Sequence, residues 1–298
     1  MKRHLLCIPC TIRAAYDIAA RATHDEELQE KVVIEVLKWL KKVSKDKEIT
    51  PNILHTYAFR VAKRITGNND PFDRLKKESN DLAVQLIPHL KSEYEKRSFR
   101  DGLRLAALST ICGNSIDFEV EDYHFSFSNL VNQLKNCLEE PLAINDLDKL
   151  MVLLPRAKKI VYLHDNAGEV VFDKFFIEVI TRNYPVKVVS AVKSGPVLND
   201  ATLNDAAQIK LDEFSQVVTT GSDSVGLVLK ECSAEFLEHV READLIISKG
   251  QGYYESLTEL EHLLRKPILY MLKAKCIVVA RSLNINVGDN VIKFSYIK

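Results

Sequence analysis

The apolar pattern of residues 159–180 changes from the period of a strand to the period of a helix. Residues 160–163 (Ile-Val-Tyr-Leu) form a short run of branched and aromatic side chains, which is typical of a buried parallel strand. From Val170 onward, apolar pairs recur every three to four residues, as in an amphipathic helix. Open α/β sheets bind ligands where a strand leads into a helix. We therefore expect Asp165 and Asn166, which lie between the two patterns, to hold a divalent metal ion.

Length and composition are those of an ordinary globular chain. With 298 residues, 46% apolar and 28% charged, the sequence is long enough for two domains. Its 41 basic residues balance 41 acidic ones, so no net charge favours nucleic acid or an anionic membrane as a partner. No run of about 18 apolar residues occurs, and Arg13 and Asp17 interrupt the apolar part of the N-terminal segment. We therefore expect a cytoplasmic protein with no membrane span and no secretory signal.

The sequence contains six cysteines, and two of them form a C-x-x-C pair. Cys7 and Cys10 supply half of a zinc-thiolate site, but no second C-x-x-C or H-x3-H completes it. The simplest interpretation is two apolar cysteines near a helix start, and a redox pair or a partial metal site is the alternative. The other four lie singly in apolar surroundings, so we expect buried thiols: Cys112, Cys137, Cys232 and Cys276.

The chain divides into a helical part and an α/β part. Nothing before about residue 100 alternates with the period of a strand, so residues 1–105 are expected to form an all-helical domain. In residues 106–298, strands alternate with helices, which predicts a mainly parallel sheet covered by helices on both faces. The expected strands are residues 160–163, 186–192, 245–247 and 267–272, a possible one at 217–220, and an edge strand at 291–296.

Polar residues follow several of the expected strands. Asp165, Asn166, Asp200, Lys249 and Lys273 each follow an apolar strand or lie in the loop after one. Because the carboxyl ends of parallel strands lie along one edge of a sheet, these residues should converge. Two carboxylates and an amide suit Mg²⁺, Mn²⁺ or a similar cation, and the two lysines suit a phosphate group.

Each of these residues also has a structural interpretation. Asp165, Asn166 and Asp200 could cap turns or helices, and Lys249 and Lys273 could be charges at strand ends. The Lys-Gly-Gln-Gly run at residues 249–252 permits close backbone approach to an anion. No P-loop and no G-x-G-x-x-G after a strand occurs in the sequence, which argues against nucleotide binding.

Six segments resemble the motifs of the metal-dependent damage-control phosphatases, long catalogued as domain of unknown function eighty-nine. They cover nearly the whole chain in the family's order, and the C-x-x-C pair resembles the stand-alone prokaryotic, especially archaeal, branch. The segments are NDPFDRLKKESN at 69–80, GNSID at 113–117, DNAGE at 165–169, LNDAT at 198–202, KGQGYYESL at 249–257 and LKAKC at 272–276.

The resemblance implies a helical N-terminal domain beside a Rossmann-like α/β/α domain, and hydrolysis of phosphate monoesters with a divalent metal such as Mn, Ni, Co or Mg. The implied substrates are sugar phosphates and damaged phosphometabolites. The implied metal ligands are Asp165, Asn166 and Asp200. The positions implied to contact substrate or take part in catalysis are Glu169, Lys249, Gly250, Gln251, Gly252, Tyr253 and Lys273, with Asn114 and Asp117 at the edge of the site.

The residues after Asp165 bear on the mechanism. Phosphatases that attack phosphorus with an aspartate use a second aspartate two residues later, but Ala167 occupies that position and cannot move a proton. We therefore expect direct attack by a metal-bound water, with Lys249 and Lys273 holding the phosphoryl oxygens. Glu169 would orient the water or a ligand, and Asp117 is a candidate proton donor. A Rossmann-type methyltransferase or nucleotide-dependent enzyme, or a non-catalytic phosphometabolite-binding protein, are the alternatives.

Overall fold

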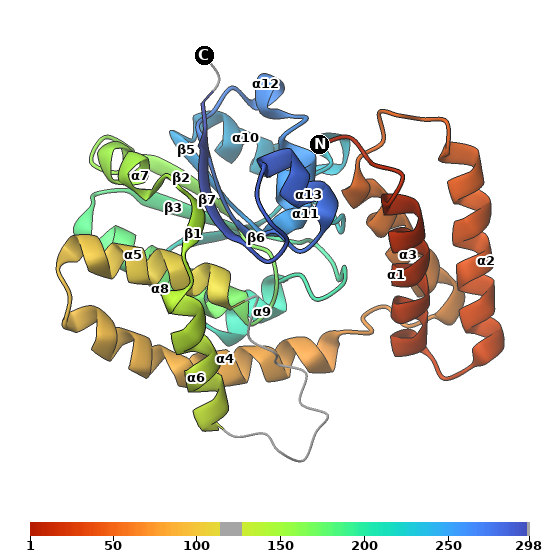
Figure 1. Ribbon diagram of the computed structural model, residues 1–298, viewed down its shortest axis with the longest axis horizontal. Helices are drawn as coiled ribbons and strands as arrows, with labels where there is room; N and C mark the ends of the chain where they lie inside the picture. The colour runs from red at the N-terminus through yellow and green to blue at the C-terminus, as the bar shows by residue number, and fades with distance from the viewer. Residues whose placement is uncertain (114–126, 297–298) are drawn as a thin grey trace.

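Helices form the N-terminal part of the chain, as the sequence predicts. The structure, a computed structural model, describes residues 1–113 and 127–296 (Figure 1). Within these ranges no strand precedes residue 142. The helices of this part are α1 (Cys7–Ala22), α2 (Glu26–Val43), α3 (Pro51–Thr66), α4 (Asp73–Glu95) and α5 (Phe99–Cys112).

The remainder forms a mostly parallel seven-stranded sheet with helices, which confirms the predicted fold class. The strands lie in the order β1-β7-β6-β5-β2-β3-β4, and only β6 and β7 pair antiparallel. Their bounds are β1 (Leu142–Asn145), β2 (Lys159–Leu163), β3 (Lys187–Val192), β4 (Gln216–Thr219), β5 (Leu245–Lys249), β6 (Ile268–Lys273) and β7 (Asn290–Ser295).

The prediction that the last strand lies at the edge of the sheet was wrong. β7 pairs with β6 on one side and with β1 on the other, so it is an internal strand. β1 forms the edge and was not predicted from the sequence. It has only four residues, and its exposed side chains alternate with half-buried ones, so it lacks a strong apolar signal.

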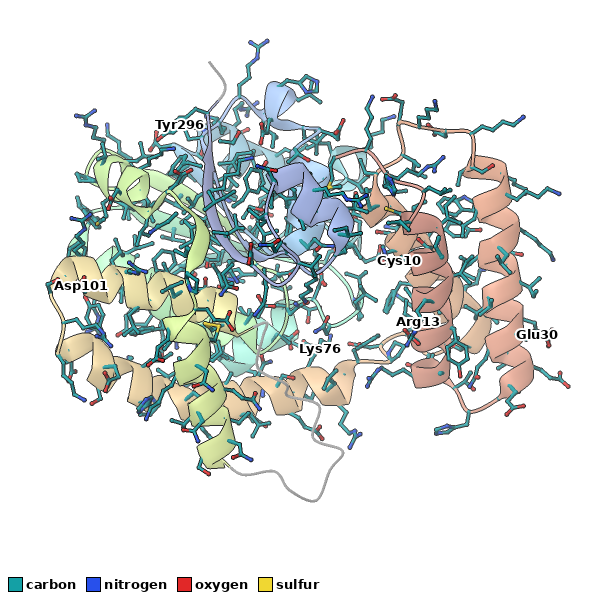
Figure 2. All side chains as sticks on the ribbon, in the orientation of Figure 1. Cys10, Arg13, Glu30, Lys76, Asp101 and Tyr296 are labelled. Atoms are coloured by element: carbon teal, nitrogen blue, oxygen red, sulfur yellow. A yellow bond between two sulfur atoms is a disulfide. The ribbon has the colours of Figure 1, made fainter. Side chains whose placement is uncertain are left out.

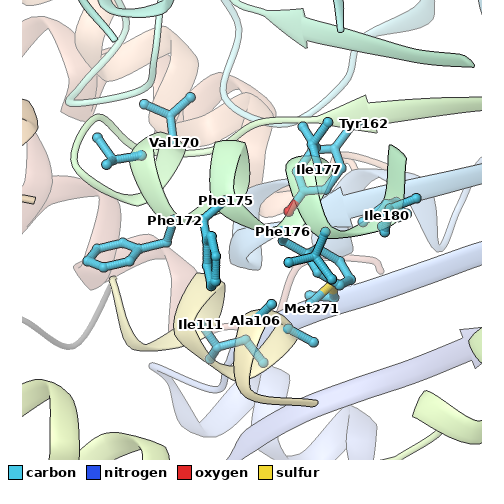
Figure 3. Close-up of a cluster of buried hydrophobic side chains, with 14 of the residues drawn as sticks. Ala106, Ile111, Tyr162, Val170, Phe172, Phe175, Phe176, Ile177, Ile180 and Met271 are labelled. Carbon is cyan, nitrogen blue, oxygen red and sulfur yellow. The ribbon is translucent and has the colours of Figure 1, made fainter. Parts of the chain in front are cut away.

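Helices cover both faces of the sheet. The longer helices of this part are α6 (Phe127–Glu139), α8 (Glu169–Asn183), α10 (Ala234–Glu242) and α11 (Gly250–Leu257), and the shorter ones are α7 (Leu147–Leu153), α9 (Leu203–Gln208), α12 (Glu261–Leu264) and α13 (Ile277–Leu283). Successive side chains of β2 point into opposite cores: Tyr162 into the core with α5 and α8, and Val161 into the core with α10, α11 and α13. Figure 3 shows the first of these cores, where Phe176 of α8 lies near Met271 of β6.

The helical part contributes to two different hydrophobic cores. Helices α1, α2 and α3 pack around their own core, which includes Ile18, Val36 and Phe59. Helix α4 extends from this bundle along the α/β part (Figure 1), and its Leu86 and Leu90 belong to the sheet core. Apolar packing therefore does not divide the chain at residue 105, although secondary structure changes beyond that point. No helix of the described segments is long and apolar enough to cross a membrane.

The expectation of four separate buried thiols was wrong for two cysteines. Cys112 at the end of α5 and Cys137 in α6 form a disulfide, which appears as a yellow bond in Figure 2. Cys232 and Cys276 are free and half-buried. The C-x-x-C pair lies at the start of α1 with Cys7 buried and Cys10 exposed, and both thiols are free.

Candidate active site

Two loops at the carboxyl edge of the sheet bring the three predicted metal ligands together. The turn between β2 and α8 carries Asp165 and Asn166, and the loop after β3 carries Asp200. The backbone N–H of Ala201 donates to the carbonyl of Asp165 at 2.7 Å, and Asn166 and Asp200 form an isolated antiparallel bridge. Because adjacent parallel strands present their carboxyl ends side by side, this juxtaposition follows from the pairing of β2 with β3.

The three side chains are almost completely buried. Asp165 and Asn166 are each 9% exposed and Asp200 is 3% exposed. The amide nitrogen of Asn166 donates to Glu169 Oε1 at 2.6 Å and to Asp165 Oδ2 at 3.3 Å. In contrast, the buried Oδ2 of Asp200 has no hydrogen-bond partner among the described residues. A buried carboxylate oxygen without such a partner is costly unless a cation or water satisfies it.

The electrostatics of this cluster favour a cation. Burial raises the pKa of Asp165 well above its ordinary value, and the charges of Asp200 and Glu169 raise it further. Burial also raises the pKa of Asp200 to about 6, although Lys193 opposes this effect. Carboxylates that destabilise one another when ionised are stabilised by a shared cation.

The donor set fits a hard divalent cation better than zinc. Two carboxylates and the amide oxygen of Asn166 are oxygen donors of the kind that Mg²⁺ and Mn²⁺ prefer. Nowhere in residues 1–113 and 127–296 do three His, Cys, Asp or Glu side chains form a group able to hold a metal. The candidate centre therefore depends on Asn166 as its third ligand, and coordination stays a prediction.

Lys249 holds Glu169 rather than facing an open cavity. Its Nζ donates to the carbonyl of Thr110 at 2.7 Å and to Glu169 Oε2 at 3.0 Å, and it lies 3.2 Å from Asp173 Oδ1. Burial disfavours its charge, but Asp173 and Glu169 outweigh burial and raise its pKa. An ammonium group has three N–H donors, and three oxygens surround this one. The predicted contact of Lys249 with phosphate is untested, and these contacts give it a role in fixing Glu169.

Gly250 brings the start of α11 into contact with a predicted metal ligand. Its φ is +75°, and a Cβ added there would lie 1.8 Å from Asp165 Oδ2. The Lys-Gly-Gln-Gly run suggested that the backbone approaches an anion closely. In the structure, the anionic group that the backbone of Gly250 approaches is the Asp165 carboxylate. Any contact of Gly250 with substrate stays a prediction.

The next three residues of α11 lie beside the site in different surroundings. The side-chain amide of Gln251 donates to Glu255 Oε1 at 3.0 Å and accepts from the N–H of Lys275. Gly252 packs against the loop after β4, where a Cβ would lie 2.8 Å from Val225 Cγ1. Tyr253 is fully buried, and its hydroxyl has no hydrogen-bond partner in the described part of the chain. The substrate contacts predicted for these residues are untested.

The remaining predicted site residues lie farther from this cluster or outside the described residues. Lys273 ends β6, two strands away from β2 in the sheet, and its Nζ lies 3.2 Å from Glu140 Oε2. Asn114 and Asp117 lie outside the described residues. Gly113, the last described residue before them, packs against α8, since a Cβ there would lie 3.1 Å from the Cα of Glu169.

Sequence reasoning did not identify Lys193 as a site residue. Lys193 is fully buried, its Nζ donates to the carbonyl of Gly226 at 2.7 Å, and it lies 3.6 Å from Asp200 Oδ2. The same Nζ lies 4.0 Å from the centre of the Tyr253 ring. Burial lowers its pKa, although Asp200 and Asp165 oppose this effect. A sequence signal was available, because Lys193 directly follows β3, just as Lys249 and Lys273 follow expected strands.

Comparison with known proteins identifies the family. The damage-control phosphatase ARMT1-like domain matches residues 4–291. The chain belongs to this family. Similar proteins include an uncharacterized protein of Methanocaldococcus jannaschii, 41% identical over 96% of this chain and 93% of that protein. A damage-control phosphatase of Pyrococcus horikoshii is 35% identical over 97% of this chain and 96% of its own length.

Other comparisons agree. A damage-control phosphatase of Archaeoglobus fulgidus is 34% identical over 98% of this chain and 99% of its own length. The crystal structure of a DUF89 family protein from Pyrococcus horikoshii superposes with a TM-score of 0.88 at 34% identity, covering 98% of both chains. The family resemblance and the fold inferred from the sequence are therefore confirmed, and membership supports a phosphatase.

Proposed function

We propose that the chain is a metal-dependent phosphatase that hydrolyses phosphate monoesters of small metabolites. The observation that carries the proposal is the cluster of Asp165, Asn166 and Asp200, in which the buried Asp200 Oδ2 has no hydrogen-bond partner in the described ranges and its ion-pair partner, Lys193 Nζ, lies 3.6 Å away. Such a cluster supplies oxygen ligands to a divalent cation. The names of two relatives, both damage-control phosphatases, support phosphorylated metabolites as the substrate class.

The metal would be held by Asp165, Asn166 and Asp200. When bound, a divalent cation makes a coordinated water more acidic and neutralises charge on the phosphoryl group. Mn²⁺, Ni²⁺, Co²⁺ and Mg²⁺ are the candidates. The protein would contribute orientation: Glu169 accepts from the Asn166 amide nitrogen, which fixes the amide group and leaves its oxygen as the atom that could bind a cation.

Two buried lysines have different roles in this proposal. Lys193 lies beside Asp200 and donates a hydrogen bond to the carbonyl of Gly226, whereas three oxygens already surround the Nζ of Lys249. Lys193 is therefore the buried ammonium better suited to a phosphoryl oxygen. Lys249 fixes Glu169 and contributes through it. Positioning and charge neutralisation of this kind supply most of the catalysis in phosphoryl transfer.

Direct attack by water is favoured over an aspartyl-phosphate intermediate. Ala167 occupies the position where an aspartyl-phosphate enzyme needs a second acid, and its methyl side chain cannot transfer a proton; its backbone N–H donates to the carbonyl of Asn199. A single displacement inverts the configuration at phosphorus, whereas two displacements retain it. Hydrolysis of a phosphate ester with a chiral phosphorus should therefore give inversion, and retention would contradict this mechanism.

The activity is tested with an aryl phosphate and each of Mn²⁺, Co²⁺, Ni²⁺ and Mg²⁺, with a chelator as the metal-free reference. We expect turnover only with metal, and loss of that turnover in Asp165→Ala with an unchanged circular dichroism spectrum. Asp212→Ala, which removes an exposed aspartate, is the matched control. Normal turnover in Asp165→Ala would refute the site. Binding of a phosphometabolite without any turnover would identify a binding protein instead.

A further inference from the structure

Asn80 of α4 connects the two loops that carry the predicted metal ligands. Its side chain is fully buried, and its Oδ1 accepts from the backbone N–H of Gly168 at 2.7 Å, in the loop after Asp165 and Asn166. Its Nδ2 donates to Asp205 Oδ1 at 3.0 Å, in the helix that follows Asp200. One side chain from the helical part therefore reaches both sides of the candidate metal centre.

Asp205 carries the connection into the second loop. Its Oδ2 accepts from both the backbone N–H and the hydroxyl of Thr202, at 2.8 and 2.7 Å, which forms a capping box at the start of α9. Thr202 follows Ala201, whose N–H donates to the carbonyl of Asp165. The hydrogen bonds from Asn80 to Asp205, from Thr202 to Asp205 and from Ala201 to Asp165 form a ring together with the chain, and the bond from Gly168 to Asn80 completes it. Asp200 precedes Ala201, so this ring helps to hold it beside Asp165.

The chemistry of the position requires an asparagine. Asn80 uses one acceptor, toward Gly168, and two donors, toward Asp205 and toward Gln208 Oε1 at 2.9 Å. An aspartate of the same shape has acceptors only, so it would place a second carboxylate against Asp205, which is 3% exposed. Buried like charges at hydrogen-bond distance repel strongly.

Neighbouring residues of the same segment strengthen the connection. Lys76 is 3% exposed, and its Nζ lies 2.7 Å from Asp70 Oδ2 and 4.0 Å from Asp205 Oδ2. The segment of residues 69–80 thus ends in a polar network directed at the loop of Asp200. This arrangement gives a physical reason for the burial of Lys76 and Asn80 in a segment whose Arg74, Lys77 and Glu78 are exposed.

We infer that Asn80 is a positioning residue for the candidate metal centre: together with the backbone hydrogen bonds that join the loops directly, it braces the Asp165 loop against the Asp200 loop without contacting the metal. The inference rests on the proposed function for the identity of the bound ion, but the joining of the two loops does not depend on it. Residues that orient metal ligands typically alter metal affinity by about 10- to 100-fold when they are changed.

The experiment compares four variants of the full-length chain. Asn80→Asp introduces the carboxylate clash, and Asn80→Ala removes the contacts without adding charge. The double variant Asn80→Asp/Asp205→Asn exchanges donor and acceptor and restores a complementary pair. Lys91→Gln is the matched control, because Lys91 also lies in α4 and pairs with Glu178 of α8, a polar contact between α4 and the α/β part that lies away from the ligand loops.

Two readouts are measured: Mn²⁺ affinity by calorimetry, and backbone hydrogen exchange of the metal-free protein in chelator. In Asn80→Asp and Asn80→Ala we expect Mn²⁺ affinity to fall about 10- to 100-fold, with faster exchange in residues 164–172 and 198–206. The double variant should recover most of the affinity, and Lys91→Gln should leave both readouts near those of the wild type. Either single variant suffices if the other does not fold.

The outcomes distinguish this inference from the proposed function. Unchanged exchange in both ligand loops of Asn80→Ala, or an equal effect in Lys91→Gln, would overturn the inference. Failure of the double variant to recover Mn²⁺ affinity would also overturn it. If the wild type bound none of Mn²⁺, Co²⁺, Ni²⁺ and Mg²⁺, the proposed metal site would fail, and the exchange data would still decide whether Asn80 joins the loops.

Discussion

Replacing Gly250 by alanine should displace a predicted metal ligand while leaving the fold intact. Gly250 has a φ of +75°, and an added Cβ would lie 1.8 Å from Asp165 Oδ2 and 2.2 Å from Asp165 Cγ. Non-bonded carbon and oxygen atoms do not approach so closely, so one of the two groups must move. Because the clashing atoms are the end of a side chain, the carboxylate can turn away without a large shift of the backbone.

The size of the effect follows from two separate costs. A side chain at positive φ costs about 1–2 kcal/mol of folding stability. Relief of the clash requires the Asp165 carboxylate to move by about 1 Å or more, and a misplacement of about 1 Å in an active site reduces the rate by about 100-fold. We therefore expect a moderate loss of stability and a much larger loss of metal-dependent turnover.

Gly67 supplies the matched control for the backbone cost. Its φ is +73°, nearly that of Gly250, and an added Cβ would meet no atom within 4 Å. Gly67→Ala and Gly250→Ala should therefore lose similar amounts of stability in thermal unfolding of the metal-free proteins. Only Gly250→Ala should lose Mn²⁺-dependent hydrolysis of an aryl phosphate and Mn²⁺ affinity.

The comparison between the two variants distinguishes displacement of the Asp165 carboxylate from general destabilisation. Activity of Gly250→Ala within a few-fold of the wild type would show that the Asp165 carboxylate does not need its present position. An equal loss of activity in Gly67→Ala would show that the effect comes from general destabilisation. Either result would refute the argument that Gly250 is required because it packs against a metal ligand.

Three further predictions concern stability and thiol chemistry. Lys249→Met should lower the free energy of unfolding by about 3–5 kcal/mol, because it leaves Glu169 and Asp173 buried without their cation. The exposed Lys77→Met should leave the free energy of unfolding nearly unchanged in the same urea titration. Burial raises the pKa of Glu255 from its ordinary 4.5 to about 7, so the folded state favours the protonated carboxyl, and the resulting stability is present at low pH and lost as pH rises through 7. Glu255→Gln should therefore be more stable than the wild type at pH 8 and similar to it near pH 4.5, and a wild-type stability that did not fall over this range would contradict the assignment. In denaturant without reductant, a thiol reagent should count four free cysteines, because Cys112 and Cys137 are paired, and a count of six in protein prepared under oxidising conditions would contradict the disulfide.

Local sequence patterns were sufficient for most of the secondary structure. The expected strand at residues 160–163 lies within β2, and the helix predicted from Val170 corresponds to α8. These elements were predictable because β2 is a short run of branched and aromatic residues and apolar pairs recur every three to four residues along α8, and a sequence displays both patterns directly. The strand-to-helix turn also located Asp165 and Asn166 at the sheet edge, since parallel pairing brings successive carboxyl ends together.

Tertiary structure alone decided the features that depend on contacts between distant segments. The pairing of β7 with both β1 and β6, and the disulfide between Cys112 and Cys137, leave no periodic signal in the sequence. The same holds for the partners of Lys249, because its apolar strand predicts burial but not which carboxylates meet its charge. The sequence thus determined that Asp165, Asn166 and Asp200 gather at the edge of the sheet, although it did not single out Lys193. Only the folded structure determined which polar groups contact each other. Burial removes water as a hydrogen-bond partner, so each buried charge must be paired with an opposite charge or a polar group that can lie far away in the sequence.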